Sequence, residues 1–268
     1  MAKLAFIGAG RMASAIVDGL LAKKAFLASE IACYTASGTS AAQLAQRTGI
    51  RKAENLDALL TEADVVVVAF KPQHLAGADA RLADLTAGKL VISVLAAKTL
   101  SRLHRTFPKA RNVIRTMPNT PAAIGAGVTG WCAHQPLLPT DRSTLSALLG
   151  AIGLEIEVPE TQIDALMAIS GCGPAFVFEF TAALREAGVA AGLERDRAEK
   201  LAVYTMLGSA RLMAETQSEP EALRNQVTSP NGTTFAGLQR LAARDFRGMI
   251  LETVLASKAR SEELSRDT

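Results

Sequence analysis

A polar turn near the C-terminus carries hydroxyl groups that could bind a small anion. Its sequence, Val227-Thr-Ser-Pro-Asn-Gly-Thr-Thr-Phe235, opens an apolar segment that predicts a helix. Ser229, Thr233 and Thr234 offer hydroxyls, and a helix start offers free backbone N–H groups, so the turn could hold a carboxylate. The same residues are also typical of an ordinary helix N-cap, and the turn taken alone leaves both interpretations open.

A second candidate site lies at the N-terminus, where Gly8-Ala9-Gly10 follows the apolar run Leu4–Ile7. With Ala13 it makes a G-x-G-x-x-A pattern between a predicted strand and a predicted helix that extends to about Leu21. Gly8 permits a tight turn, Gly10 lets a pyrophosphate approach the backbone, and Ala13 lets the helix pack closely on the strand. The pattern predicts a dinucleotide site, although a tight turn in any α/β protein is the alternative.

The end of the predicted second strand, Ile31–Tyr34, bears on the choice of cofactor. The loop Tyr34-Thr-Ala-Ser-Gly-Thr-Ser40 has no acidic residue, whereas NAD sites often place one there to bind the ribose hydroxyls. Small hydroxyls and backbone N–H groups could instead hold a 2′-phosphate, which favours NADPH. The loop has no Lys or Arg, and Arg47 lies further along. A plain helix N-cap region, with Thr39 or Ser40 as the cap, is the alternative.

Three further stretches could face a ligand. Lys71 follows the apolar strand predicted at Asp64–Phe70, and is either near a cofactor or simply solvated. Asn119, within Met117-Pro-Asn-Thr-Pro121, is either beside the nicotinamide end or a residue that stabilises the turn. Ser170-Gly-Cys-Gly-Pro174 is either a ligand-facing turn or a place where two helices approach closely.

Composition narrows the function classes. A net charge of +3, with no Lys/Arg cluster and few aromatic residues, argues against nucleic acid. No apolar run approaches the length of a membrane span, and no signal sequence opens the chain, so we expect a cytoplasmic protein. The separated cysteines and histidines predict no disulfide and no metal site; they are Cys33, Cys132, Cys172, His74, His104 and His134.

Apolar patterning predicts two domains. Strand-like and helix-like segments alternate over residues 1–158, including helices predicted at Leu56–Ala63 and Leu75–Leu85, which is typical of a doubly wound, mostly parallel Rossmann-like sheet. Segments 127–158 are expected as additions at the sheet edge. Residues 159–268 predict only helices, rich in Ala and Leu. Such a helical domain often buries a face in a partner, so we expect a homodimer or a larger homo-oligomer.

The chain resembles the Δ1-pyrroline-5-carboxylate reductase family. The matching stretches occur in order across nearly the whole chain, and they are Phe6-Ile-Gly-Ala-Gly-Arg-Met-Ala13, Phe70-Lys-Pro-Gln73, Arg115-Thr-Met-Pro-Asn-Thr-Pro121, Ser170-Gly-Cys-Gly-Pro-Ala-Phe176 and Val227-Thr-Ser-Pro-Asn-Gly-Thr-Thr234. The resemblance implies reduction of 1-pyrroline-5-carboxylate to L-proline with NADPH, or alternatively NADH. It also implies a site shared by the two chains of a dimer, which in the family often assembles into a decamer.

The resemblance implies a role for each matching position. Ser229, Gly232 and Thr233 would hold the substrate carboxylate, Thr234 would bond the ring nitrogen as the catalytic contact, and Glu160 would lie near the substrate. The cofactor residues, with Asn119 added from its place at a strand end, would be Ile7, Gly8, Ala9, Gly10, Arg11, Met12, Ser37, Asn55, Ala69, Phe70, Lys71, Pro72, Ala96, Ala97, Lys98 and Asn119.

This sequence departs from the family pattern at two points. Asn231 stands where the family usually has Gly, and Asn tolerates left-handed backbone angles better than most residues. The second-strand loop lacks the Asn-Arg often found in bacterial members, which leaves the preference between NADPH and NADH open. Two rival functions are a β-hydroxyacid dehydrogenase, for which Lys200 is poorly placed as a proton donor, and a nucleotide-binding protein without turnover.

Overall fold

A computed structural model describes residues 3–266 of the chain. Its sheet has eight strands in the order β3-β2-β1-β4-β5-β6-β7-β8. All neighbours pair in parallel except β6 and β7, which are antiparallel. The strands are β1 Leu4–Ile7, β2 Ile31–Tyr34, β3 Arg51–Lys52, β4 Val65–Val68, β5 Leu90–Ser93, β6 Asn112–Met117, β7 Gly127–Ala133 and β8 Gly153–Glu157.

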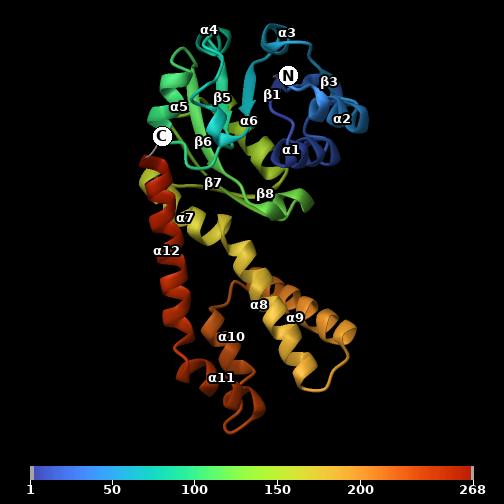
Figure 1. The fold of residues 1–268 in the computed structure, drawn as a ribbon, viewed down its shortest axis with the longest axis vertical. Coiled ribbons are helices and arrows are strands. Elements are labelled where there is room, and N and C mark those ends of the chain that lie inside the picture. The colour runs from blue at the N-terminus through green and yellow to red at the C-terminus, as the bar shows by residue number, and fades with distance from the viewer. Residues whose placement is uncertain (1–2, 267–268) are drawn as a thin grey trace. The chain divides into compact units, whose positions relative to one another are not determined.

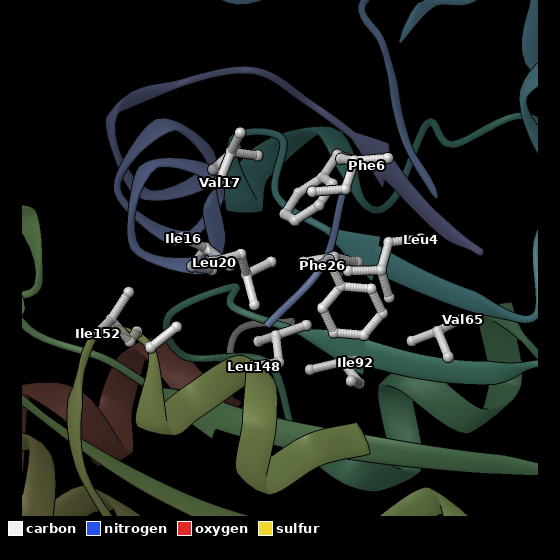
Figure 2. Packing of buried hydrophobic residues seen from close by; sticks show 14 of the residues in the cluster. Leu4, Phe6, Ile16, Val17, Leu20, Phe26, Val65, Ile92, Leu148 and Ile152 are labelled. Atoms are coloured by element: carbon white, nitrogen blue, oxygen red, sulfur yellow. The ribbon is translucent and has the colours of Figure 1, made fainter. Parts of the chain in front are cut away.

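Helices cover both faces of the sheet because its central strands are apolar on both sides. Phe6 of β1 packs toward Ile16 and Leu20 of α1, and Leu148 of α6 joins the same cluster (Figure 2). The alternate residues Ala5 and Ile7 belong to a second cluster on the opposite face. The helices of this part are α1 Arg11–Ala22, α2 Thr39–Thr48, α3 Leu56–Leu60, α4 Leu82–Leu85, α5 Leu100–Thr106, α6 Pro139–Gly150 and α7 Ile163–Leu166.

The predicted helix over residues 75–85 is wrong for most of its length. The structure has a 3-10 turn at Pro72–His74 and a helix only at Leu82–Leu85. Asp79 explains the break, because its carboxylate accepts hydrogen bonds from the backbone N–H and the guanidinium of Arg81. Such local side-chain bonds compete with helix formation.

The cap predicted for α2 is also wrong. Gly38 occupies the N-cap position with φ of 73°, and Thr39 is the first helical residue. The helix predicted at Leu56–Ala63 ends at Leu60, as α3. The predicted edge additions are confirmed: β7 pairs with β6 and carries β8 beyond it (Figure 1).

After β8 the described residues form helices only, as the sequence predicts. A π-helical turn, Met167–Gly171, extends α7. The remaining helices are α8 Gly173–Ala190, α9 Arg195–Thr216, α10 Pro220–Gln226, α11 Thr233–Ala243 and α12 Phe246–Arg266 (Figure 1). The architecture confirms the predicted class, a Rossmann-like sheet followed by an all-helical part.

The chain forms two compact units. The first extends to Cys172 and includes the C-terminal stretch from Ser257; the second is Gly173–Ala256. The predicted domain boundary at residue 158 differs from the end of the first unit, and it stays a prediction. Within the first unit, the Ser261 hydroxyl donates a 2.6 Å hydrogen bond to the Asp164 carboxylate, which fastens the end of α12 beside α7.

The second unit leaves much of its apolar surface uncovered. Phe178, Tyr204 and Leu207 are more than half exposed in the single chain. Residues of α8 and α9 also line an apolar hollow of about 470 Å³. Uncovered apolar surface of this extent is typical of a surface that contacts a protein partner or a membrane.

One helical stretch, Glu160–Ala190, is long and apolar enough to cross a membrane by length and composition. The prediction that no apolar run reaches the length of a membrane span is therefore wrong for this stretch. Only 6% of its most apolar window is buried inside the single chain. Its apolar surface belongs to the same uncovered helices, so a partner chain would account for it equally well.

Candidate functional site

A cleft of about 680 Å³ opens where the strand order reverses between β1 and β4. Ligands of doubly wound sheets bind at such a switch point, outside the carboxyl ends of the strands. The Gly8 N–H donates to the Tyr34 carbonyl at 2.9 Å, and the Ala69 N–H donates to the Ile7 carbonyl at 2.8 Å. These bonds hold the ends of β1, β2 and β4 together as the floor of the cleft.

The glycine turn has the geometry that a pyrophosphate requires. Gly8 has φ of 114°, and a Cβ there would lie 2.4 Å from the carbonyl of Ala69. A Cβ on Gly10 would meet no atom within 4 Å, so the space beside its backbone is open. Gly10 is the N-cap of α1, and Ala13 is fully buried under the first turn. The N–H groups at the start of α1 therefore face room for an anion.

The cleft gathers about half of the predicted cofactor residues. Ser37 and Lys71 line it from the ends of β2 and β4. The other predicted residues in its wall are Ile7, Gly8, Ala9, Gly10, Ala69 and Phe70. Arg11 lies beside it and, with Ala9 and Gly10, lines a neighbouring hollow of about 430 Å³. The rest of the predicted set lies outside this cleft.

Several of these outlying residues have identifiable structural contacts. Met12 packs against the buried core, and Pro72 begins the 3-10 turn after β4. Asn55 is the N-cap of α3, and its side-chain oxygen accepts a 2.8 Å hydrogen bond from the Ala58 N–H. Their roles toward a cofactor stay predictions.

The loop after β5 contains Ala96, Ala97 and Lys98. Ala97 has φ of 57°, a left-handed angle that costs a residue with a Cβ about 1–2 kcal/mol. Lys98 is buried, and burial, followed by the charge of Arg102, lowers the pKa of its ammonium group. A strained residue next to a buried amine is typical of a functional loop.

Asn119 is buried between two segments. Its side-chain oxygen accepts from the Val128 N–H and its side-chain nitrogen donates to the Ser170 carbonyl, both at 2.9 Å. A Cβ on Gly171 would lie 3.1 Å from Met117, so the small residues of Ser170–Pro174 let this loop approach closely. Both observations favour the structural interpretation of these two stretches.

Glu160 is engaged within the first unit. One of its carboxylate oxygens accepts from the Leu100 N–H at 2.6 Å and from the Arg115 guanidinium at 3.0 Å. Arg115 is 4% exposed at its side chain, and Asp164 lies 3.9 Å from its other nitrogen. The contact of Glu160 with substrate stays a prediction, because this carboxylate already neutralises a buried cation.

The predicted substrate turn lies in the second unit. Gly232 is the N-cap of α11, and its N–H donates to the Ser229 carbonyl at 3.0 Å. A Cβ on Gly232 would lie 2.4 Å from the Ser229 hydroxyl, which would have to rotate away, and 3.1 Å from the Ser229 carbonyl oxygen. Thr233 and Thr234 are exposed. Asn231 has φ of 59°, which confirms that it takes the left-handed conformation expected at this position.

The structure adds cleft residues that the sequence does not individually assign to a cofactor. Thr35, Ser40 and His74 line the cleft, as do Leu56 and residues of the broken helix, namely Gly77, Ala78, Asp79 and Leu82. Lys52 of β3 lines an adjoining hollow of about 360 Å³ with Ser37 and Gly38. No sequence signal points to Lys52, because the spacing of the segments does not reveal that β3 pairs beside β2.

No group of three or more metal-ligating side chains occurs among residues 3–266. Cys33 and Cys132 are free and buried. Burial raises the pKa of the Cys33 thiol, and the nearby charge of Lys52 partly offsets that rise. Burial, followed by the charge of Glu160, raises the pKa of the Cys132 thiol to about 12. Neither thiol is built to act as a nucleophile.

Comparison with known proteins identifies both halves of the chain. A family model described as pyrroline-5-carboxylate reductase dimerisation matches residues 160–264, and one described as NADP oxidoreductase, coenzyme F420-dependent, matches residues 3–97. A pyrroline-5-carboxylate reductase of Synechocystis sp. is 40% identical over 267 residues, covering 98% of each chain.

Solved structures agree with this comparison. A pyrroline-5-carboxylate reductase from Coxiella burnetii superposes with a TM-score of 0.93 at 33% identity, covering 98% of each chain. A pyrroline carboxylate reductase from Plasmodium falciparum with NADP bound gives a TM-score of 0.86 at 26% identity, again over 98% of each chain. The likeness therefore includes the sheet and the helices together.

Proposed function

The chain belongs to the pyrroline-5-carboxylate reductase family, and we propose that its reaction uses the cleft at Gly8–Gly10 together with the turn Ser229–Thr234. The activity is reduction of 1-pyrroline-5-carboxylate to L-proline with NAD(P)H, the last step of proline biosynthesis. The observation that carries the arrangement is the open space beside Gly10, at the start of α1 and at the switch point of the sheet.

The glycine turn would bind the pyrophosphate through the N–H groups at the start of α1. Ser37 and Lys71 would border the adenosine and nicotinamide sides of the cofactor in the cleft, while Ala96–Lys98 would complete its groove. When bound, the reduced nicotinamide supplies the hydride for the imine carbon. The remaining steps depend on how this chain binds and orients the substrate.

The turn before α11 would hold the substrate carboxylate. The Ser229 and Thr233 hydroxyls and the first N–H groups of α11 suit a carboxylate, since a helix N-terminus favours negative charge. Thr234 would hydrogen-bond the ring nitrogen and fix the ring's orientation. A hydroxyl is a poor acid, so the imine would be protonated before it binds or by water. Holding the carboxylate and nitrogen together positions the reacting carbon.

Self-association follows from the dimerisation domain at residues 160–264. We further propose that the turn of one chain serves the cleft of a second copy, with dimers assembled into a decamer. The exposed side chains of Phe178, Tyr204 and Leu207 support a helical interface, because a second copy would remove them from water. We expect the enzyme in the cytoplasm, which suits its unpaired cysteines.

The test is the rate of NADPH oxidation with pyrroline-5-carboxylate in Thr234→Ala and Thr234→Ser variants. Removing one positioned hydrogen bond at a reacting group should lower kcat roughly tenfold to a hundredfold, and Ser should recover much of it. Thr216→Ala removes an exposed threonine of α9 and is the matched control. Unchanged kinetics in Thr234→Ala would remove Thr234 from the mechanism. Oxidation of hydroxyacids instead of reduction of the imine would support the dehydrogenase alternative.

A further inference from the structure

The loop after β2 contains no cation that could bind a phosphate on the adenosine ribose. Residues 34–40 contain Thr35, Ser37, Thr39 and Ser40 but no lysine or arginine. They contain no acidic residue either, so nothing in the loop would select the unphosphorylated ribose. A cation that favours NADPH over NADH must therefore come from a neighbouring element.

Two nearby arginines are already engaged. The Arg47 guanidinium lies 2.6 Å from the Asp18 carboxylate on α1, and this hydrogen bond raises the pKa of Arg47. Arg51 directs its guanidinium nitrogens at the Ala58 carbonyl, at 3.3 and 3.4 Å. Both cations therefore have partners in the fold.

Lys52 is the basic residue that faces the loop. β3 pairs in parallel with β2, and Lys52 is in register with Cys33, just before the loop begins. Its ammonium nitrogen lies 3.7 Å from where a Cβ on Gly38 would stand. It is exposed, and within residues 3–266 no hydrogen bond or ion pair of its side chain is observed. β3 and α2, which flank the loop, lie together at the edge of the sheet (Figure 1).

Lys52 and the loop enclose a single hollow. It has a volume of about 360 Å³ and is lined by Ser37, Gly38 and Lys52 among others. It shares Tyr34, Thr35, Ala36 and Ser37 with the larger cleft, so the two are adjacent. Gly38 has φ of 73° and no side chain, which leaves room between the loop backbone and the ammonium group.

We infer that Lys52, together with the Ser37 hydroxyl, binds the 2′-phosphate of NADPH and makes this enzyme select NADPH over NADH. The inference rests on the proposed dinucleotide site, since it concerns the adenosine end of the same cleft. An ammonium group is a compact charge with three donors, which suits a phosphate. The cation missing from the loop is thus supplied by the adjacent strand, about fifteen residues further along the chain.

Glu54 limits the strength of this selection. It lines the same hollow, and its carboxylate would repel the phosphate that Lys52 attracts. The two residues therefore have opposite predicted effects. Removing the charge of Lys52 should weaken selection for the 2′-phosphate, and removing the charge of Glu54 should strengthen it.

The experiment is a calorimetric titration of the full-length enzyme with ADP-ribose and with 2′-phospho-ADP-ribose. These probes differ only in the 2′-phosphate and lack the nicotinamide, so no reaction takes place. We expect the wild type to bind 2′-phospho-ADP-ribose at least about tenfold more tightly than ADP-ribose. Lys52→Gln should remove about tenfold of that ratio and leave ADP-ribose binding unchanged. Glu54→Gln should raise the ratio about threefold. Lys24→Gln, in the exposed turn after α1, should match the wild type.

Several results would overturn the inference. An unchanged ratio in Lys52→Gln, or equal losses for both probes, would show that Lys52 does not recognise the 2′-phosphate. A ratio that falls in Glu54→Gln would assign the selection to Glu54 instead. Failure of the wild type to bind either probe would overturn the dinucleotide site as well. Normal ADP-ribose binding with no preference for the phosphate would overturn this inference alone.

Discussion

Replacing Glu160 with Gln tests whether this carboxylate stabilises the fold or contacts the substrate. The change keeps an oxygen that can accept from the Leu100 N–H and removes the charge that faces Arg115. Arg115 is almost fully buried, so it would be left with Asp164, whose oxygen lies 3.9 Å away. The structure therefore predicts a loss of stability with little effect on substrate affinity.

The size of the loss follows from the geometry of the pair. Breaking a fully buried ion pair by removing one partner costs about 3–5 kcal/mol. Glu160 is 35% exposed and Asp164 retains part of the attraction, so we expect about 2 kcal/mol. For a chain of this size that corresponds to a fall in Tm of roughly 4–8 °C.

Thermal unfolding and steady-state kinetics of the wild type and of Glu160→Gln distinguish a structural role of Glu160 from contact with the substrate. Glu62→Gln is the matched control, because Glu62 pairs with Lys3 at 2.9 Å on the surface, where such a pair contributes less than about 1 kcal/mol. A double-mutant cycle with Arg115→Met should give a coupling energy of about 2 kcal/mol. A wild-type Tm in Glu160→Gln, accompanied by a several-fold rise in KM for pyrroline-5-carboxylate, would refute the reasoning and assign Glu160 to the substrate.

Two further predictions concern the glycine turn and the buried thiols. Gly8→Ala should fail to fold stably, because its Cβ would overlap the Ala69 carbonyl. Gly10→Ala should keep its Tm and bind ADP-ribose about tenfold more weakly, as measured by calorimetry. Unchanged binding of ADP-ribose by Gly10→Ala would contradict the pyrophosphate assignment. At pH 8, Cys33 and Cys132 should react with Ellman's reagent only after denaturation, and native labelling followed by mass spectrometry would expose any error. Because the pKa of Cys132 is raised to about 12, the folded chain keeps a proton that the unfolded chain releases above about pH 9, so this thiol lowers stability only as pH rises past that value.

Much of the fold could be predicted because the patterns that indicate its strands and turns lie within short stretches of sequence. The run Val65–Val68 is apolar on both faces, and the strand-turn-helix pattern at Gly8–Gly10 is continuous in sequence. The broken helix could not be predicted from periodicity, since the bonds between Asp79 and Arg81 compete with a helical pattern that otherwise fits. That segment also lines the cleft, which agrees with the expectation that local rules fail at functional positions.

Residues of the candidate site that lie within one continuous segment can be predicted from the sequence, whereas residues that folding brings in from other segments cannot. Gly10 is predicted from its position after a strand, whereas Ser37 lies in a strand-end loop and is assigned by resemblance. Lys52 was missed because it reaches the loop from the next strand, through sheet pairing that sequence spacing does not reveal. Glu160 was assigned by resemblance, and only the coordinates reveal that Arg115 and the Leu100 N–H occupy its carboxylate.

The two units differ in how far they bury their apolar residues within a single chain, and this difference bears on which part of the proposed site needs a partner. The first unit buries its apolar residues in two clusters on the faces of the sheet, so it can hold the glycine turn rigidly without a partner. The helices of the second unit keep Phe178 and Leu207 more than half exposed, so they depend on another chain for a core. The turn at Ser229–Thr234 belongs to those helices. Dimerisation would therefore order the predicted substrate turn, and dissociation should abolish turnover while the first unit still binds ADP-ribose.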